Sequence, residues 1–270
     1  METTMEKERL FDSVEWQVDD RVALITLDRP DAGNGIDENL ARGLKEAADR
    51  VFALGSEGRL RAAVLRASGK VFTVGGDLNA FAAPDDRGSY VSLTAELLHA
   101  GLLTLTRSAV PVVSVVHGTA AGGGVGIALS ADIVLVSDDA KLVLAYTAAG
   151  LTPDCGSTWI LPQLIGLPRA LDLALTNRAI TGATALEWGL ASRAVPREQL
   201  EDTLAEVLDG LRRASFPAVS RTKQLMRAAS GRARSEALDA EAASIANVIN
   251  GPDGIEGVDA FLAKRTPQFD

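Results

Sequence analysis

Two glycine-rich segments contain residues whose types and spacing point to chemistry. Gly75 and Gly76 directly follow the apolar run Val71–Val74, and a second cluster, GTAAGGGVG, covers Gly118–Gly126. A glycine pair after a strand is typical of a tight turn. Glycines also let backbone N–H groups approach a ligand closely, and the amides at a helix start attract anions.

The amides of these two turns predict an oxyanion hole. If the turns at Val74 and Gly123 face each other, their N–H groups can hold one oxygen between them and stabilise a carbonyl that becomes an enolate. Nucleotide-binding motifs do not fit, because the sixth position from Gly122 is Ile127 rather than glycine and no Gly-Lys-Ser/Thr follows. From the residues alone, a tight turn and an oxyanion hole both stay open.

Composition limits the classes of partner. The 270 residues suit one sizeable domain, and 47% apolar with 23% charged residues is typical of a globular protein. A net charge of −9 argues against non-specific binding to nucleic acid or to a membrane surface. We therefore expect neither as a partner, and an anionic ligand needs a local site.

Cysteine and apolar patterning predict the compartment. The single cysteine, Cys155, excludes an internal disulfide and a multi-cysteine metal site, so we predict a reducing cytoplasm and no metal. The first 16 residues are charged and lack the apolar core of a signal peptide. No stretch of about 18 apolar residues is present to span a membrane.

Apolar runs that alternate with helical patterns predict an α/β fold with both faces of the sheet covered. Asp37 is the expected N-cap of a helix in which Leu40, Leu44 and Val51 recur at helical spacing. A second helix is expected over Leu93–Thr106. Strands are expected at Arg21–Asp28, Arg61–Ala67, Pro111–Gly118 and within Ala131–Tyr146.

The pattern becomes helical after Val195. We predict a core domain over residues 1–195 and a helical oligomerisation domain over residues 196–270 that packs on the core or on a neighbouring subunit. Its helices are expected at Arg197–Ala214, Ala218–Ala229, Glu236–Ile249 and Ile255–Lys264.

Six segments in order along the chain resemble the crotonase, or enoyl-CoA hydratase/isomerase, superfamily. The resemblance implies a ββα spiral with a C-terminal helical trimerisation domain, a homotrimer or dimer of trimers, and acyl-CoA thioester substrates. Coenzyme A is then part of the substrate and no separate cofactor is expected. The segments are LDRPDAGNGID, VFTVGGDL, VPVVSVVHGTAAGGGVGIALSADIVL, GLTPDCGSTWILPQLIG, TGATALEWGLASRAV and EGVDAFLAKRTPQF.

The resemblance also implies roles for individual residues. The amides of Val74 and Gly123 are expected to hold the thioester oxygen, while Asp77 fixes the loop or caps a helix. Phe261 and Lys264 are expected to reach the nucleotide from a neighbouring subunit. Substrate or coenzyme A contacts are assigned to Arg29, Gly35, Thr73, Gly75, Tyr146, Phe261 and Lys264.

The chain departs from the hydratase pattern at both catalytic glutamates, which align with Gly126 and Tyr146. Asp154 remains as a carboxylate base, at a position where similar isomerases and dehalogenases carry an aspartate. One carboxylate can move a proton between two carbons of an enoyl thioester, whereas hydration is easier with two groups. We therefore expect an enoyl-CoA isomerase that most resembles the ring-1,2-epoxyphenylacetyl-CoA isomerase type, placed in fatty acid or phenylacetate metabolism.

Three other functions stay open. They are an enoyl-CoA hydratase, another crotonase-type enzyme such as a dehalogenase or hydrolase, and a non-catalytic protein that binds acyl-CoA or RNA. Dehalogenase chemistry would require a histidine, and the chain offers only His99 and His117. We interpret His117 and Cys155 as structural, and His99 as structural or as a pocket residue.

Overall fold

A seven-stranded sheet forms the centre of the computed structural model, which describes residues 6–269. The strand order is β1-β2-β3-β4-β5-β7-β10, antiparallel from β1 to β3 and parallel from β3 onward. The strands are β1 (Glu8–Leu10), β2 (Val14–Asp19), β3 (Val22–Leu27), β4 (Ala62–Ala67), β5 (Val112–Val116), β7 (Ile133–Ser137) and β10 (Arg193–Val195).

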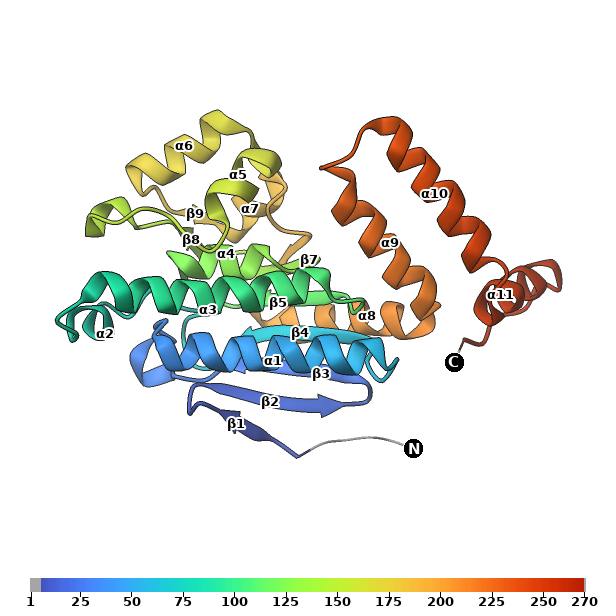
Figure 1. Ribbon diagram of the computed structural model, residues 1–270, viewed down its shortest axis with the longest axis horizontal. Helices are drawn as coiled ribbons and strands as arrows, with labels where there is room; N and C mark the ends of the chain where they lie inside the picture. The colour runs from blue at the N-terminus through green and yellow to red at the C-terminus, as the bar shows by residue number, and fades with distance from the viewer. Residues whose placement is uncertain (1–5, 270) are drawn as a thin grey trace.

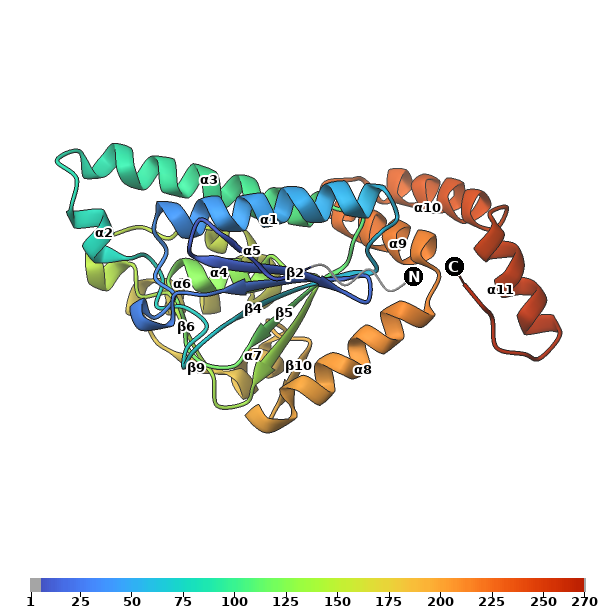
Figure 2. The same ribbon diagram turned by 90° about the horizontal axis from the view of Figure 1, so that it is seen from below.

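Helices cover both faces of this sheet (Figures 1 and 2). The paired helices α1 (Glu38–Ser56) and α3 (Arg87–Arg107) lie on one face, and α8 (Leu200–Arg213) lies on the other. Successive strand residues point to opposite faces, so the sheet separates two apolar cores. In β4, Ala63 and Leu65 pack in the core beneath α1, whereas Val64 packs with the buried residues of α8. The predicted α/β fold is confirmed.

The start of α1 follows from its sequence. Asp37 has an extended backbone and its Oδ1 accepts a hydrogen bond from the Leu40 amide at 2.8 Å, as an N-cap does. Leu40, Leu44 and Val51 are fully buried along one side of the helix. Both predictions, the cap and the apolar stripe, are confirmed.

A short second sheet and isolated bridges align successive turns of the chain. The small sheet consists of β6 (Ala120–Ala121), β8 (Lys141–Val143) and β9 (Ile180–Thr181). Parallel bridges pair Ile36 with Gly76 and Thr73 with Ala120. Segments that follow β3, β4 and β5 therefore lie side by side, as in the predicted ββα spiral. This stacking brings the two glycine-rich segments together.

The remaining helices complete the core and the C-terminal part. Helices α4 to α7 lie together with the small sheet (Figure 1). The bounds of these four helices are α4 (Gly123–Leu129), α5 (Ser157–Ile165), α6 (Leu167–Thr176) and α7 (Gly182–Trp188), and the short helix α2 covers Leu78–Ala82. The described part of the chain contains no helix long and apolar enough to cross a membrane.

The predicted C-terminal helices are present as α8, α9 (Phe216–Ala229), α10 (Arg234–Val248) and α11 (Pro252–Leu262). Helices α9 and α11 begin two and three residues earlier than predicted, because each accommodates a proline in its first turn. The domain boundary after residue 195 stays a prediction, although α8 packs on the sheet. Helices α10 and α11 project beyond the core (Figures 1 and 2).

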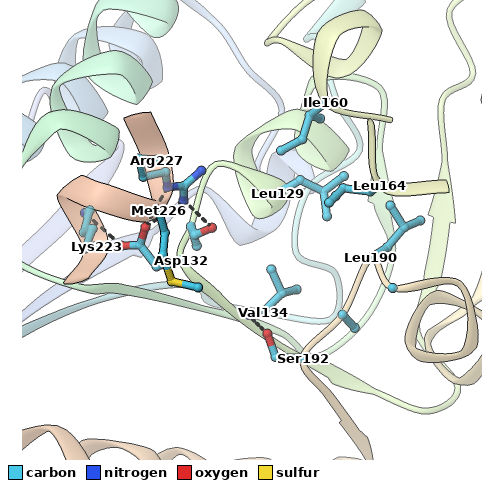
Figure 3. A pocket seen from close by; sticks show the side chains of 13 residues that line it. Leu129, Asp132, Val134, Ile160, Leu164, Leu190, Ser192, Lys223, Met226 and Arg227 are labelled. Carbon is cyan, nitrogen blue, oxygen red and sulfur yellow. Dashed lines mark hydrogen bonds and ion pairs between the residues drawn. The ribbon is translucent and has the colours of Figure 1, made fainter. Parts of the chain in front are cut away.

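A buried ionic cluster fastens α9 to the core (Figure 3). The Asp132 carboxylate pairs with Lys223 at 2.8 Å and with Arg227 at 2.7 Å. Lys223 is 5% exposed and also donates hydrogen bonds to the carbonyls of Leu105 and Val110. The three side chains border a cavity of about 330 Å³, and the single Asp132 carboxylate serves both cations. We assign this cluster to stability.

The cluster predicts a large effect on stability. Asp132→Ala leaves the buried Lys223 ammonium without its carboxylate, so the free energy of unfolding should fall by about 3–5 kcal/mol. Urea denaturation followed by circular dichroism measures this change. The control is Asp209→Ala, which removes an exposed partner of Arg212 and should cost less than about 1 kcal/mol. Equal losses in the two variants would contradict the assignment.

Candidate active site

The two glycine turns touch each other through their backbones. Gly75 has a φ of +89°, and a Cβ there would lie 2.8 Å from the Ala121 carbonyl oxygen and 3.3 Å from Gly122 Cα. A side chain at residue 75 would therefore clash with the backbone that leads into α4. Glycine at position 75 therefore allows the two turns to pack closely against each other.

The structure corrects one predicted oxyanion donor. The Val74 N–H donates to the Gly33 carbonyl at 3.0 Å, so it is already used within the chain and the prediction for Val74 is wrong. The Gly75 N–H donates to Thr73 Oγ1 at 3.0 Å. Among the described residues, neither the Gly76 nor the Gly123 N–H has an intrachain acceptor. Gly76 and Gly123 line the same cavity, so they form the available pair of donors.

The cavity that these two glycines line has a volume of about 320 Å³. Its walls are mainly apolar and include Phe81, Leu98 of α3 and Leu144. Asp154 is the only charged residue among the described residues that line it. The cavity therefore combines two unpartnered amides with a single carboxylate.

Asp154 lies on the turn before α5 and is held from two sides. The Tyr146 hydroxyl donates a hydrogen bond to its Oδ1, and His99 Nε2 of α3 lies 4.0 Å from its Oδ2. A Cβ on Gly123 would lie 3.5 Å from Oδ1, which places the carboxylate beside the start of α4. The Asp154 side chain is 36% exposed. The structure thus places Asp154, Tyr146 and Gly123 next to one another, and their catalytic and binding roles stay predictions.

Two neighbours of Asp154 remain protonated at neutral pH. Burial, together with the negative charge of Asp154, raises the pKa of the Tyr146 phenol well above its usual value. The same two causes raise the pKa of the Cys155 thiol. Tyr146 is therefore a hydrogen-bond donor to the carboxylate, and Cys155 is a neutral thiol rather than a nucleophile, which agrees with its structural interpretation.

His99, Asp154 and Cys155 form a compact group of possible metal ligands. Their ligand atoms lie within 4.8 Å of one another, a grouping that the described residues show only here. However, His99 Nε2 accepts a hydrogen bond from the Cys155 amide at 3.1 Å. Its lone pair is engaged and the thiol is protonated, so hydrogen bonding explains the group without a metal.

His117 has a different environment. Its Nε2 lies 3.1 Å from the Gly69 carbonyl oxygen, and burial lowers the pKa of the imidazole. The contact joins the end of β5 to the loop after β4. This placement agrees with the structural interpretation of His117.

The residues assigned to the coenzyme lie in two different places. Thr73 is buried and donates through Oγ1 to the Asn34 carbonyl, which holds the loop that contains Gly35. Phe261 at the end of α11 is 82% exposed, and Lys264 follows it, beyond the core in the projecting part of the chain (Figure 1). One chain therefore does not bring these two residues to the cavity.

Arg29 is balanced by two carboxylates. It lies 3.0 Å from Asp37 and 3.2 Å from Asp77, and it also donates to the Gly35 carbonyl. Asp77 in turn caps α2 by accepting from the amides of Asn79 and Ala80, which confirms its predicted structural role. Arg29 thus holds the loop, and its contact with the nucleotide stays a prediction.

Residues 17–270 match the sequence family described as enoyl-CoA hydratase/isomerase. The chain belongs to the enoyl-CoA hydratase/isomerase family. It is 33% identical over 254 residues to the 1,2-epoxyphenylacetyl-CoA isomerase of Escherichia coli, covering 93% of this chain and 96% of that protein. It is 32% identical over 261 residues to the trans-2-decenoyl-[acyl-carrier-protein] isomerase of Streptococcus mutans, covering 96% and 98%.

Solved structures of the same family share the fold. The crystal structure of an enoyl-CoA hydratase from Mycobacterium smegmatis superposes with a TM-score of 0.88 at 28% identity, covering 97% of this chain and 99% of that chain. An enoyl-CoA hydratase from Polaromonas sp. JS666 gives a TM-score of 0.90 at 25% identity, with 96% and 100% covered. The resemblance found in the sequence is confirmed, and the protein is an enzyme of the enoyl-CoA hydratase/isomerase family.

At Gly126, packing rules out the carboxylate of the family's hydratase pattern. A Cβ on Gly126 would lie 2.3 Å from the Cys155 carbonyl oxygen and 2.6 Å from the Cys155 Cβ. A glutamate therefore does not fit at this position unless the turn that contains Asp154 moves. The other glutamate position is filled by Tyr146, whose hydroxyl donates to Asp154.

The contact between the glycine turns predicts a difference between two glycine variants. Gly75→Ala should lower the free energy of unfolding by about 2–4 kcal/mol, because left-handed strain is added to a clash with the Ala121 carbonyl. Gly150 also has positive φ, but no atom lies within 4 Å of its Cβ position, so Gly150→Ala should lose only about 1 kcal/mol. Urea denaturation measures both, and equal losses would mean that the close approach is unimportant.

Proposed function

We propose that the protein is an enoyl-CoA isomerase that moves a double bond through a thioester enolate, with Asp154 as its single acid and base. The observation that carries this proposal is the cavity with one charged side chain and two unpartnered amides, at Gly76 and Gly123. The names of the Escherichia coli and Streptococcus mutans relatives, which both describe isomerases, support it.

The proposed reaction uses these groups in two proton transfers. The thioester oxygen accepts hydrogen bonds from the Gly76 and Gly123 amides, which stabilise the negative charge that develops when C2 loses a proton. Asp154 takes that proton, and the electron pair spreads over a dienolate. The Asp154 carboxyl then returns a proton to C4, so that the double bond moves from C3=C4 to C2=C3 and the carboxylate is regenerated.

Tyr146 acts in this scheme through the carboxylate. Its hydroxyl donates to Asp154 Oδ1 and remains protonated because burial and the aspartate charge raise the pKa of the phenol. This bond restrains the carboxylate beside the start of α4. Tyr146 is therefore a positioning residue.

The other functions have less support from the geometry. Hydration is disfavoured because Cys155 fills the space of a second carboxylate at Gly126. Hydrolysis through an ester of Asp154 would need a histidine to activate water, and the Nε2 of His99 is occupied by the Cys155 amide. A protein that only binds acyl-CoA would not need a carboxylate beside the two amides.

Asp154→Asn tests the proposed base. An amide does not accept the C2 proton, so the rate of conversion of 3-enoyl-CoA to conjugated 2-enoyl-CoA should fall by about 10²–10⁴-fold. The absorbance of the conjugated thioester measures the rate, and calorimetry with a saturated acyl-CoA should show nearly unchanged binding. The control is Asp172→Asn, which removes a surface partner of Arg178. Full activity of Asp154→Asn would exclude Asp154 as the base.

The same assay separates the alternatives. Loss of conjugated absorbance from 2-enoyl-CoA would indicate hydration. Binding of acyl-CoA without turnover of either substrate would indicate a non-catalytic protein.

We further propose that the chain assembles as a homotrimer or a dimer of trimers, in which α10 and α11 meet a neighbouring core. These helices contain the buried residue Ala260 alone, and together with Ile249, which follows α10, they expose seven large apolar side chains. The seven are Leu238, Ile245, Ile249, Ile255, Val258, Phe261 and Leu262. Cover by a second copy would remove this apolar surface from water and bring Phe261 and Lys264 to the coenzyme of a neighbour.

Light scattering tests the assembly. The wild type should have the mass of three or six chains of 28.3 kDa each, and the double variant Phe261→Asp, Leu262→Asp should have a lower mass. A control with aspartate at Met226, which is exposed on α9, shows whether any added charge disrupts assembly. A wild type with the mass of one chain at every concentration would contradict the proposal.

A further inference from the structure

Two cavities adjoin the turn that contains Asp154 and Cys155. The first is the reaction cavity already described, which is lined by Leu98 and Asp154. The second has a volume of about 490 Å³ and is lined by the next residue of each segment, His99 and Cys155. Neighbouring residues of α3 and of the turn therefore face different cavities.

The second cavity is apolar and opens to the surface of the chain. Leu103 and Trp159 line it with more than half of their surface exposed, at 52% and 62%. Among the described residues that line it, Arg227 is the one with a charged side chain, and it is paired with Asp132. Water that enters this cavity would lie behind the turn, on the side of Asp154 away from the substrate.

Cys155 packs tightly against the start of α4, between residues that line the two cavities. It is 5% exposed, and its Sγ lies 2.9 Å from the position that a Cβ on Gly123 would occupy. Its own Cβ lies 2.6 Å from the position of a Cβ on Gly126. Cys155 is thus wedged against two glycines of α4, and neither glycine has room for a side chain.

The backbone of Cys155 is strained to reach this place. Its φ is +52°, in the left-handed region that residues with a Cβ seldom adopt, and such strain gathers at functional sites. The Cys155 amide donates to His99 Nε2 at 3.1 Å, which joins the turn to α3. The Cys155 side chain and this hydrogen bond thus tie the turn to both α4 and α3.

We propose that Cys155 and His99 form a partition that keeps water of the second cavity away from Asp154. This inference rests on the proposed isomerase function. The proton that Asp154 takes from C2 would exchange with any water that reaches the carboxyl, and a solvent proton would then be delivered to C4. With the partition closed, the same proton returns to the substrate.

The proposal is tested by the reaction in D₂O. In an isomerase with a closed partition, product formed at early times should retain the substrate hydrogen at C4, whereas exchange places deuterium there. NMR and mass spectrometry of the 2-enoyl-CoA product locate and count the deuterium. Cys155→Gly removes the wedge and tolerates positive φ, and it should give a larger deuterated fraction than the wild type.

Further variants separate the partition from other effects. His99→Ala removes the acceptor of the Cys155 amide and should also raise the deuterated fraction. The proposal can therefore be tested even if Cys155→Gly folds poorly. Cys155→Ser keeps a side chain of similar size and should stay near the wild type. Trp159→Ala widens the second cavity on its far side and should leave both the rate and the deuterated fraction unchanged.

Two results would overturn the inference in distinguishable ways. If Cys155→Gly and His99→Ala form product with the wild-type deuterated fraction, the partition does not control exchange, although the isomerase function stands. If the wild type itself forms no conjugated product from 3-enoyl-CoA, the proposed function fails first.

Discussion

The approach of two backbone turns is the constraint on which the rest of the site depends. Gly75 and Gly122 come so close that a side chain at residue 75 would meet a carbonyl oxygen at 2.8 Å. Parallel bridges on either side, Ile36 to Gly76 and Thr73 to Ala120, fix the register of these segments. With that register, the Gly76 and Gly123 amides border one cavity, while the amides of Val74, Gly75 and Gly122 donate within the chain.

The charges around the site divide into two kinds. Those of Arg29, Asp37 and Asp77 form ion pairs in the loop next to the glycine turn, and those of Asp132, Lys223 and Arg227 form ion pairs where α9 meets the core. Asp154 is different, because its neighbours Tyr146 and Cys155 stay neutral. A carboxylate without a cationic partner can gain and lose a proton without breaking an ion pair.

Local features were predictable from the sequence, while features set by distant contacts were not. The roles of Asp37 and Asp77 as N-caps follow from residue type and position. The oxyanion donor was misplaced by two residues, because the Val74 N–H donates to the carbonyl of Gly33, a contact that the local sequence does not indicate. The sequence did contain a signal for Gly76. This residue directly precedes Asp77, the N-cap of α2, so it lies in the turn and not in the helix.

The contacts of Asp154 show the same division. Resemblance of the segment around it placed Asp154 at the site, but its distance to His99 depends on how α3 crosses the turn before α5. Spacing along the chain contains no information on that crossing. The second cavity behind the turn was missed for the same reason, since its walls come from α3, α4, α5 and α9.

The contact between Gly126 and Cys155 has a consequence for how reaction types can change within this fold. A glutamate at residue 126 is the change that would bring the sequence nearer to the hydratase pattern, yet the carbonyl of Cys155 already fills that space. Because the Asp154–Cys155 turn must be rebuilt before the new side chain fits, the two positions are bound to change together. Divergence or redesign toward the hydratase pattern therefore requires a change in the conformation of the Asp154–Cys155 turn first. Gly126→Glu alone would produce a clash in the core rather than a new activity.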